Sequence, residues 1–286
     1  MELKEFLTSR PNPFTREPQR TLDWDKLAGF NDTSTWLAPM SEALQAGHVP
    51  LSRLGGLPLM KQQTPWPESP SGPMAFVGQL HFAELAGVSR TDGPPCPRDG
   101  LLALFMDVDD LQPASSSHWK LVYEPSVAEL HERTRPGQER PARCRPQRFE
   151  WITDRARDRR AFVLALRSGE RPRAEGPRGP DHRILGPPAW IDDRFDDFFV
   201  DPRIEFELAE HGLECRAGAL MSAEEKGLDV VAIVRQARQW LLLWQIDTDP
   251  QADVSWTDNG TLYLLVRATD LAERRFDSAR CVIQST

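Results

Sequence analysis

The feature that most constrains the fold of this chain is a repeated series of turns and strands, one series in each half. Each series has, in the same order, a Gly/Pro turn, an apolar strand interrupted by one glutamine, and an Asp-Gly or Asn-Gly turn that opens a second apolar strand. The pieces are RLGGLP at 53–58, FVGQL at 76–80 and DGLLALFM at 99–106, then RILGPP at 183–188, LLWQI at 242–246 and NGTLYLLV at 259–266. Such a turn before an apolar run is a strong hairpin signal. We therefore expect two related β-rich lobes around a pseudo-twofold axis.

The remaining pattern favours a mainly β fold of the α+β class with a few peripheral helices. Short apolar runs punctuated by Gly and Pro continue from residue 49 onward, which is typical of strands and turns. Helices are expected at 21–30 and 34–46, and a third is expected after a capping box formed by Ser222 and Glu225.

These patterns divide the chain into two parts. Residues 1–47 are expected to be a partly helical N-terminal extension, and residues 48–284 a duplicated domain with lobes at about 48–166 and 183–284. The segment 167–182 between the lobes is rich in Gly, Pro and charged residues, so we interpret it as a connecting loop.

The amino-acid composition disfavours a membrane-spanning or a secreted protein. The 286 residues include 35 Lys and Arg against 43 Asp and Glu, giving a net charge of -8. The longest apolar runs, at 101–106 and 240–244, are far shorter than the ~18 residues that a membrane span needs, so no membrane partner is expected. The N-terminal segment lacks the pattern of a secretory signal, and four widely spaced cysteines fit free thiols. We expect a cytoplasmic protein.

The common catalytic and cofactor motifs are missing from the sequence. Glycine-rich phosphate loops, the nucleophile elbow and the paired-histidine zinc helix do not occur. His131-Glu132 begins like a zinc helix, but Arg135 stands where the second histidine is needed. We therefore expect no cofactor, no metal and no enzymatic activity. A hydrolase that uses His81 or scattered carboxylates remains an alternative.

The acidic run DDRFDDFFVD at 192–201 allows three interpretations. Its acids are paired rather than spaced as in a calcium loop, which disfavours a calcium site. It is either a solvated acidic face with its phenylalanines in the core, or an anchor-and-charge surface for a basic protein. The residues predicted to bind such a partner are Trp190, Asp192, Asp193, Asp196, Asp197, Phe198 and Asp201.

Charge is segregated along the chain in a way that is compatible with a basic protein partner. Residues 131–180 carry 14 arginines against 7 acids, whereas residues 181–230 carry 5 basic and 13 acidic residues. The arginine-rich stretch is interspersed with acids and the whole chain is acidic, so we expect no direct nucleic-acid binding. A basic loop folded against the acidic segment of the same chain explains the pattern equally well.

Two glutamines and two tryptophans are the remaining candidates. Gln79 and Gln245 interrupt apolar strands at corresponding places in the repeat, so their amides either satisfy backbone groups or line a ligand cleft between the lobes. Trp66, between two prolines, and Trp190, which follows a pair of prolines and an alanine, are the tryptophans that we expect to be exposed.

Taken together, these segments resemble the YwqG-like family, a domain family of unknown function. The resemblance covers roughly residues 48–284 and rests on Ser52–Pro58, Trp66-Pro67, Phe76–Leu80, Pro97–Leu101 with Phe105, Leu185-Gly186, Trp240–Asp247 and Gly260–Tyr263. It implies a duplicated β-rich roll. The N-terminal extension and the arginine-rich insertion before Gly186 depart from the family pattern.

The resemblance also implies a function. Members of the family are often encoded beside bacterial toxins, and some are immunity proteins against effectors of the type VI secretion system. This sequence is similar to an immunity protein paired with a nuclease effector, so the implied partner is a cognate toxin with a basic nuclease domain. The alternative is a small-molecule or peptide binding module that uses the cleft between the lobes.

Overall fold

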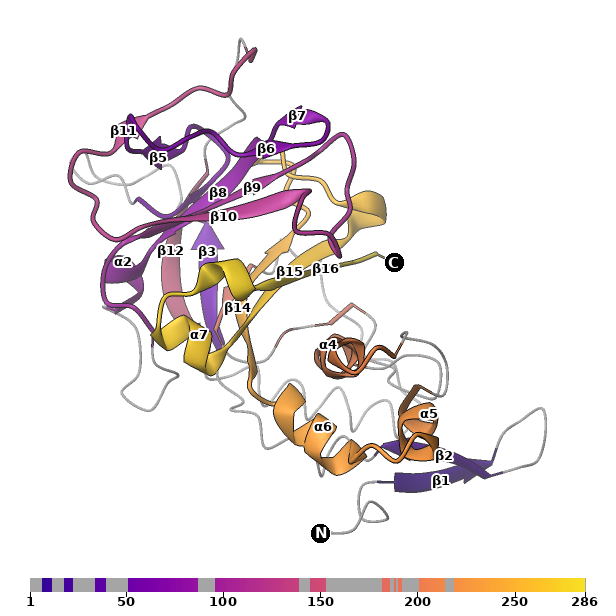
Figure 1. The fold of residues 1–286 in the computed structure, drawn as a ribbon. Helices are drawn as coiled ribbons and strands as arrows, with labels where there is room; N and C mark the ends of the chain where they lie inside the picture. Colours follow the sequence, from indigo (N-terminus) through magenta and orange to yellow (C-terminus); the bar gives the residue numbers. More distant parts are fainter. Residues whose placement is uncertain are drawn as a thin grey trace, which may run out of the picture. The chain divides into compact units, whose positions relative to one another are not determined.

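The computed structural model describes eleven stretches of the chain. They are residues 7–11, 18–22, 34–39, 51–86, 96–138, 145–152, 182–185, 188, 190–191, 201–213 and 219–285. The chain divides into two compact units, which are Met1–Asn31 with Ala189–Leu241, and Asp32–Pro188 with Leu242–Thr286. We call the first the helical unit and the second the sheet unit. The described strands form four sheets, and the expected mainly β, α+β class is confirmed (Figure 1).

One ten-stranded sheet contains the strands of both halves of the sequence. From one edge to the other its strands are β10 (Trp119–Glu124), β9 (Leu101–Met106), β8 (Ala75–His81), β4 (Arg53–Leu54), β12 (Arg145–Ile152), β3 (Ser34–Pro39), β13 (Arg183–Ile184), β14 (Trp240–Asp247), β15 (Thr261–Arg267) and β16 (Arg280–Gln284). Outward from the central pair β12–β3, each side contains four strands in the order in which they follow along the chain. We call β4, β8, β9 and β10 the first copy and the other four the second copy.

The central strand β3 corrects the expectation for the N-terminal extension. Residues 34–39 were expected to be helical, but six residue pairs join them to β12, and β3 also pairs with β13. Thr35 and Trp36 have side-chain types that favour strands, and pairing on both sides outweighs the local helical pattern. The helix expected at 21–30 is also wrong at its start, because β2 (Pro18–Leu22) pairs with β1 (Leu7–Pro11). Residues 23–33 and 40–50 lie outside the described part.

Apolar runs become buried strands in both copies. All six residues of β9 are buried, and so are the first six of the seven residues of β15. Continuous apolar runs of this length are typical of strands that are covered on both faces. In the first copy Phe105 packs edge-on against Trp66, with ring centroids 5.3 Å apart, within a cluster that also contains Met60 and Met74.

The two copies touch each other inside the sheet unit. A Cβ atom at Gly78 would lie 2.8 Å from the carbonyl oxygen of Arg53 and 3.0 Å from the ring of Trp244, which belongs to the second copy. Phe276, in the short helix η3 (Phe276–Ser278), stacks on Phe82 of the first half with ring centroids 5.8 Å apart. Apolar contacts therefore join the two halves within the sheet unit.

Shorter elements connect the strands of the sheet unit. Two small sheets pair β5 (Leu59–Met60) with β11 (His131–Glu132) and β6 (Glu68–Ser69) with β7 (Gly72–Pro73). Single helical turns follow β8 and β15 as α2 (Phe82–Ala86) and α7 (Ala268–Ala272), and η2 (Thr257–Asn259) precedes β15.

The helical unit contains α4 (Pro202–Glu210), α5 (Ala219–Glu225) and α6 (Val230–Ala237). Ile204 and Leu208 pack in one apolar cluster with Val230, Ile233 and Val234, so the helices enclose a core of their own. The expected capping box is wrong. Ser222 lies inside α5, and the side chain of Asp229 instead caps α6 by accepting a hydrogen bond from the amide of Ala232.

Candidate functional site

The two glutamines occupy corresponding buried places in the two copies. Gln79 pairs across the sheet with Arg53, and Gln245 pairs with Arg183. The Gln79 side chain accepts a hydrogen bond from the amide of Leu59 at 3.0 Å and donates one to the carbonyl of Leu51 at 2.7 Å. These contacts support the structural role for Gln79. A ligand cleft lined by Gln79 and Gln245 stays a prediction.

Two further contacts repeat between the copies. The amide of His81 donates to the hydroxyl of Ser52 at 2.9 Å, and in the second copy the amide of Asp247 donates to Nδ1 of His182 at 3.2 Å. In both copies the next residue along the chain then donates its amide to the carbonyl of a turn glycine, Gly100 or Gly260. His81 and Asp247 are therefore equivalent positions, each two residues after the repeated glutamine.

In the second copy Asp247 belongs to a network of hydrogen-bonded polar side chains. One carboxylate oxygen of Asp247 accepts hydrogen bonds from the hydroxyl of Thr261 at 2.8 Å and from the amide of Gln245 at 3.4 Å. His182 is fully buried, and its Nε2 lies 3.2 Å from the equally buried carboxylate of Asp249. Since Nδ1 of His182 accepts from Asp247, Nε2 is the nitrogen that donates to Asp249.

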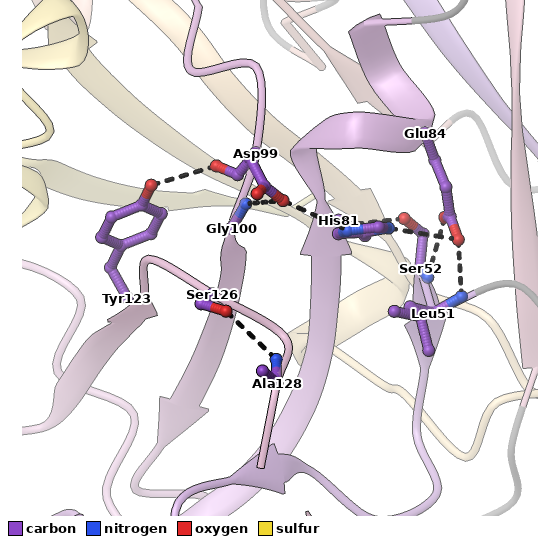
Figure 2. Close-up of polar contacts among 9 residues, drawn as sticks. All are labelled: Leu51, Ser52, His81, Glu84, Asp99, Gly100, Tyr123, Ser126 and Ala128. Carbon is purple, nitrogen blue, oxygen red and sulfur yellow. Dashed lines mark hydrogen bonds and ion pairs between the residues drawn. The ribbon is translucent and has the colours of Figure 1, made fainter. Parts of the chain in front are cut away.

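In the first copy the equivalent position is a histidine between two carboxylates, as Figure 2 shows. Nδ1 of His81 lies 3.5 Å from Oε1 of Glu84, and Nε2 lies 3.8 Å from Oδ1 of Asp99. The three side chains come from the end of β8, from α2 and from the turn before β9. Both ring nitrogens are buried, and neither makes a hydrogen bond to any residue that the structure describes.

Backbone contacts hold the two carboxylates in place. The Glu84 carboxylate accepts hydrogen bonds from the amides of Leu51 at 2.7 Å and Ser52 at 3.1 Å. Asp99 accepts from the amide of Gly100, and its carbonyl accepts from the hydroxyl of Tyr123 at 3.0 Å (Figure 2). Within the described part of the chain, neither carboxylate forms an ion pair with a lysine or an arginine. We call His81, Glu84 and Asp99 the His81 cluster.

The groups beside the His81 cluster are poor nucleophiles. Burial raises the pKa of the Cys96 thiol to about 12, so it carries a proton at neutral pH. Burial raises the pKa of Tyr123 and outweighs the opposing effect of the Arg274 charge, so the hydroxyl stays protonated and donates to the carbonyl of Asp99. The His81 cluster therefore combines one imidazole and two carboxylates with neighbouring groups that keep their protons at neutral pH.

Sequence reasoning found only one member of this cluster. His81 was a candidate for hydrolysis, whereas Glu84 and Asp99 were not singled out. The repeat contained the missing signal, because aligning the halves on Gln79 and Gln245 places His81 opposite Asp247, and aligning the turns on Gly100 and Gly260 places Asp99 opposite Asn259. A position at which two copies differ in ionisable side chains is a place to look for divergence.

The two described residues of the predicted partner surface are buried, which corrects their expected exposure. Trp190 is 8% exposed, and the guanidinium of Arg203 lies 6.0 Å from its ring centroid. Asp201 is 1% exposed, caps α4 through the amide of Arg203 at 2.9 Å, and forms an ion pair with the Arg203 side chain. The other predicted residues, Asp192, Asp193, Asp196, Asp197 and Phe198, lie outside the described residues.

Trp66, the second tryptophan expected to be exposed, is also buried. Its indole nitrogen donates to the carbonyl of Met74 at 2.9 Å, and its ring packs on Phe105. The prolines beside it turn the chain so that the ring enters the core while its polar atom finds a backbone partner.

Other ionisable groups of the described segments have structural partners. Desolvation alone would raise the pKa of Asp107. Favourable interactions with Ser69 and Ser71, together with hydrogen bonds from the amides of Asp110 and Asp109, outweigh it and lower that pKa to about 2. Among described residues there is no group of three metal-ligand side chains arranged to hold an ion. The described helices include none with the length and apolar character of a membrane span.

A family model for a domain of unknown function, DUF1963, matches residues 52–285. The chain belongs to the DUF1963 family. The DUF1963 match begins at Ser52, the residue whose hydroxyl accepts from the amide of His81, and runs through both copies. It is consistent with the resemblance to the YwqG-like family and assigns no activity. No curated protein matches the sequence.

Proposed function

We propose that this DUF1963 protein is a non-enzymatic immunity protein that binds and neutralises a basic protein toxin. The main support for the proposal is the location of the negative charge in the chain. Residues 189–241, the larger segment of the helical unit, contain 12 acidic and 6 basic residues, so they account for -6 of the net charge of -8. The acidic character is thus concentrated in one compact unit rather than spread over the chain.

Some acids of the helical unit have roles inside it, and others lie at its surface. Asp201 pairs with Arg203, and Glu207 accepts a hydrogen bond from the indole of Trp240 at 2.7 Å, so both are buried for structural reasons. Glu224, Glu225 and Asp229 are exposed, around the turn between α5 and α6. These exposed acids supply part of the field that would attract a basic protein.

A nuclease is the kind of toxin that suits this charge. An enzyme that binds DNA presents a basic groove to the phosphates, and an acidic inhibitor can occupy the same groove. The resemblance to immunity proteins of the type VI secretion system supports a DNase effector as the partner. Because such a toxin cuts DNA inside the cell, we place the inhibitor in the cytoplasm.

The proposal is tested by co-purifying the tagged protein with the product of the adjacent reading frame and titrating the pair by calorimetry. We expect a one-to-one complex with a Kd of about 1 nM or tighter, because immunity proteins of DNases are among the tightest binders known. Raising the salt concentration should slow association, since exposed charges are screened beyond about a Debye length. Failure to form a complex at any salt concentration would reject the immunity role.

Two double variants test whether binding depends on the acids of the helical unit or only on the net charge of the whole protein. Glu224→Lys with Glu225→Lys reverses two exposed charges at the C-terminal end of α5, where lysine also suits the helix dipole. Glu68→Lys with Asp277→Lys reverses two exposed charges of the sheet unit and changes the net charge equally. The first pair should weaken binding about tenfold or more and the second about twofold. Equal effects would exclude the helical unit as the binding surface.

A further inference from the structure

We propose that the centre of the ten-stranded sheet is a strand-acceptor site, which β3 of the same chain fills in the monomer and β3 of a second copy fills in a strand-exchanged dimer. The proposal is independent of the toxin partner. It rests on the pairing of β3, which lies beside β12 on one side and β13 on the other and is antiparallel to both (Figure 1). We call the place between β12 and β13 the β3 slot.

Backbone pairing defines the β3 slot. The last six residues of β12 pair with β3, and only the first two, Arg145 and Pro146, pair with β4. On the other side, both residues of β13 pair with β3, whereas one pair, Arg183 with Gln245, joins β13 to β14. Ladders of this kind bind an extended main chain, and side chains add specificity. The slot therefore accepts an antiparallel strand in this register, whichever copy of the chain supplies it.

The strand that fills the slot comes from outside the family domain. The DUF1963 match covers residues 52–285, which include every strand of the ten-stranded sheet except β3. The duplicated domain thus has a place at the centre of its sheet for a strand that it does not itself contain. The same principle operates where one chain donates a strand that completes the sheet of another.

The connection from β3 to β4 is much longer than the distance between them. Pro39 pairs with Gln147 of β12, and Arg53 pairs with the preceding residue, Pro146, on the other side of that strand. Two strand spacings separate the end of β3 from the start of β4, which is about 10 Å. Residues 40–52 reach about 40 Å when fully extended. The connection therefore does not restrict β3 to the slot of its own chain.

Concentration then decides which copy fills the slot. A strand on a tether of this reach competes with strands of other molecules at an effective concentration on the order of 1 mM. Dilute chains should therefore fold as monomers, and chains that fold at several hundred micromolar should form exchanged dimers as well. Reciprocal exchange leaves both slots filled, so the dimer has no more unpaired strands than two monomers.

The experiment uses two full-length chains, one with Leu37→Cys and the other with Phe149→Cys. These two residues pair directly in β3 and β12, where facing Cα atoms lie about 4.5–5.5 Å apart, within the range of a disulfide. The chains are unfolded in urea, mixed, refolded together at about 10 µM or about 300 µM, and oxidised. Peptide mapping by mass spectrometry counts only the bond between the two substituted positions. The linked fraction of the refolded protein should be at least about tenfold higher at the higher concentration.

Two controls make the result decisive. Ala38→Cys replaces Leu37→Cys in the first control, because position 38 belongs to the other face of β3, and it should link to the Phe149→Cys chain at most one-tenth as often. The second control carries Leu37→Cys and Phe149→Cys in one chain, which should close within that chain at 10 µM. If this double variant closes but the mixed chains do not link at either concentration, exchange is overturned. Equal linking of the position 37 and 38 variants, or a double variant that does not close, overturns the slot itself.

Discussion

Buried polar side chains in this protein serve mainly to satisfy backbone groups. Gln79 does so with both ends of its amide, which join the segments at Leu51 and Leu59 on either side of β4. Asp107 does so through the amides of Asp109 and Asp110 at the end of β9. A buried group of this kind costs little while paired and much when its partner is removed, because the orphaned donor or acceptor has no water to replace it.

Replacing Gln79 by leucine should destabilise the protein by about 2–4 kcal/mol, because it leaves the Leu59 amide and the Leu51 carbonyl without a partner. Urea unfolding followed by tryptophan fluorescence measures the change. Gln63→Leu, at an exposed position, is the control and should stay within about 0.5 kcal/mol. A Gln79→Leu protein as stable as the natural one would show that these two bonds contribute nothing.

Asp107 should give the protein a pH dependence below pH 4. Its pKa is lowered from 3.8 to about 2, so its contribution to stability is present above pH 4 and is lost as the pH falls through 2. Asp107→Asn should lower the free energy of unfolding by about 1 kcal/mol at pH 7 and by almost nothing at pH 2. Acid titrations at fixed urea concentration test this, and a difference that is constant with pH would contradict it.

At the scale of the elements, the position at which a helix begins depends both on local sequence and on packing. The start of α6 is set by a local contact, because the side chain of Asp229 accepts a hydrogen bond from the amide of Ala232, three residues later. Ser222 and Glu225 have the same local signature, yet they lie within α5, which is followed by a turn at Gly227 with a φ of 74°. A capping motif therefore indicates where a helix can begin, and the packing of α4, α5 and α6 decides which candidate is used.

The two candidate caps make opposite predictions. Asp229→Ala should destabilise the helical unit by about 1 kcal/mol, the usual cost of losing an N-cap, whereas Ser222→Ala should change stability by less than about 0.5 kcal/mol. Urea unfolding followed by far-ultraviolet circular dichroism measures both. If Ser222→Ala proved the more damaging, the helix boundary at Asp229 would be wrong.

At the scale of the whole molecule, the sheet unit depends on a strand from outside the repeat. β3 lies between β12 and β13 at the centre of the ten-stranded sheet, so it joins the first copy to the second. Without it, two strands in the middle of the sheet would have unpaired backbone groups, which invite aggregation. The N-terminal extension is thus part of the fold rather than an appendage of the duplicated domain.

Two truncations test that dependence. A chain of residues 32–286 keeps β3 and should unfold cooperatively, because the helices at 202–237 retain their apolar cluster. A chain of residues 48–286 lacks β3 and should aggregate or lose its near-ultraviolet circular dichroism signal. Size-exclusion chromatography and thermal melts compare the two. A monomeric 48–286 chain that melts at the same temperature as 32–286 would show that β3 is dispensable.

The sequence alone determined much of the local structure. The apolar runs LLWQI at 242–246 and TLYLLV at 261–266 were expected to be strands and lie within β14 and β15, because apolar runs bounded by turns are a signal contained within each segment. The repeat also predicted that Gln79 and Gln245 stand at corresponding places, and the structure pairs them with Arg53 and Arg183.

Tertiary structure decided the rest, for a physical reason that sequence patterns do not contain. β3 is a strand because two distant segments pair with it, and Trp190 and Asp201 are buried because Arg203 and its neighbours cover them. The His81 cluster likewise exists only once β8, α2 and the turn before β9 meet, with Glu84 and Asp99 brought to opposite nitrogens of one ring. Local pattern sets what each segment favours, whereas non-local pairing and desolvation set which groups meet and what they then do.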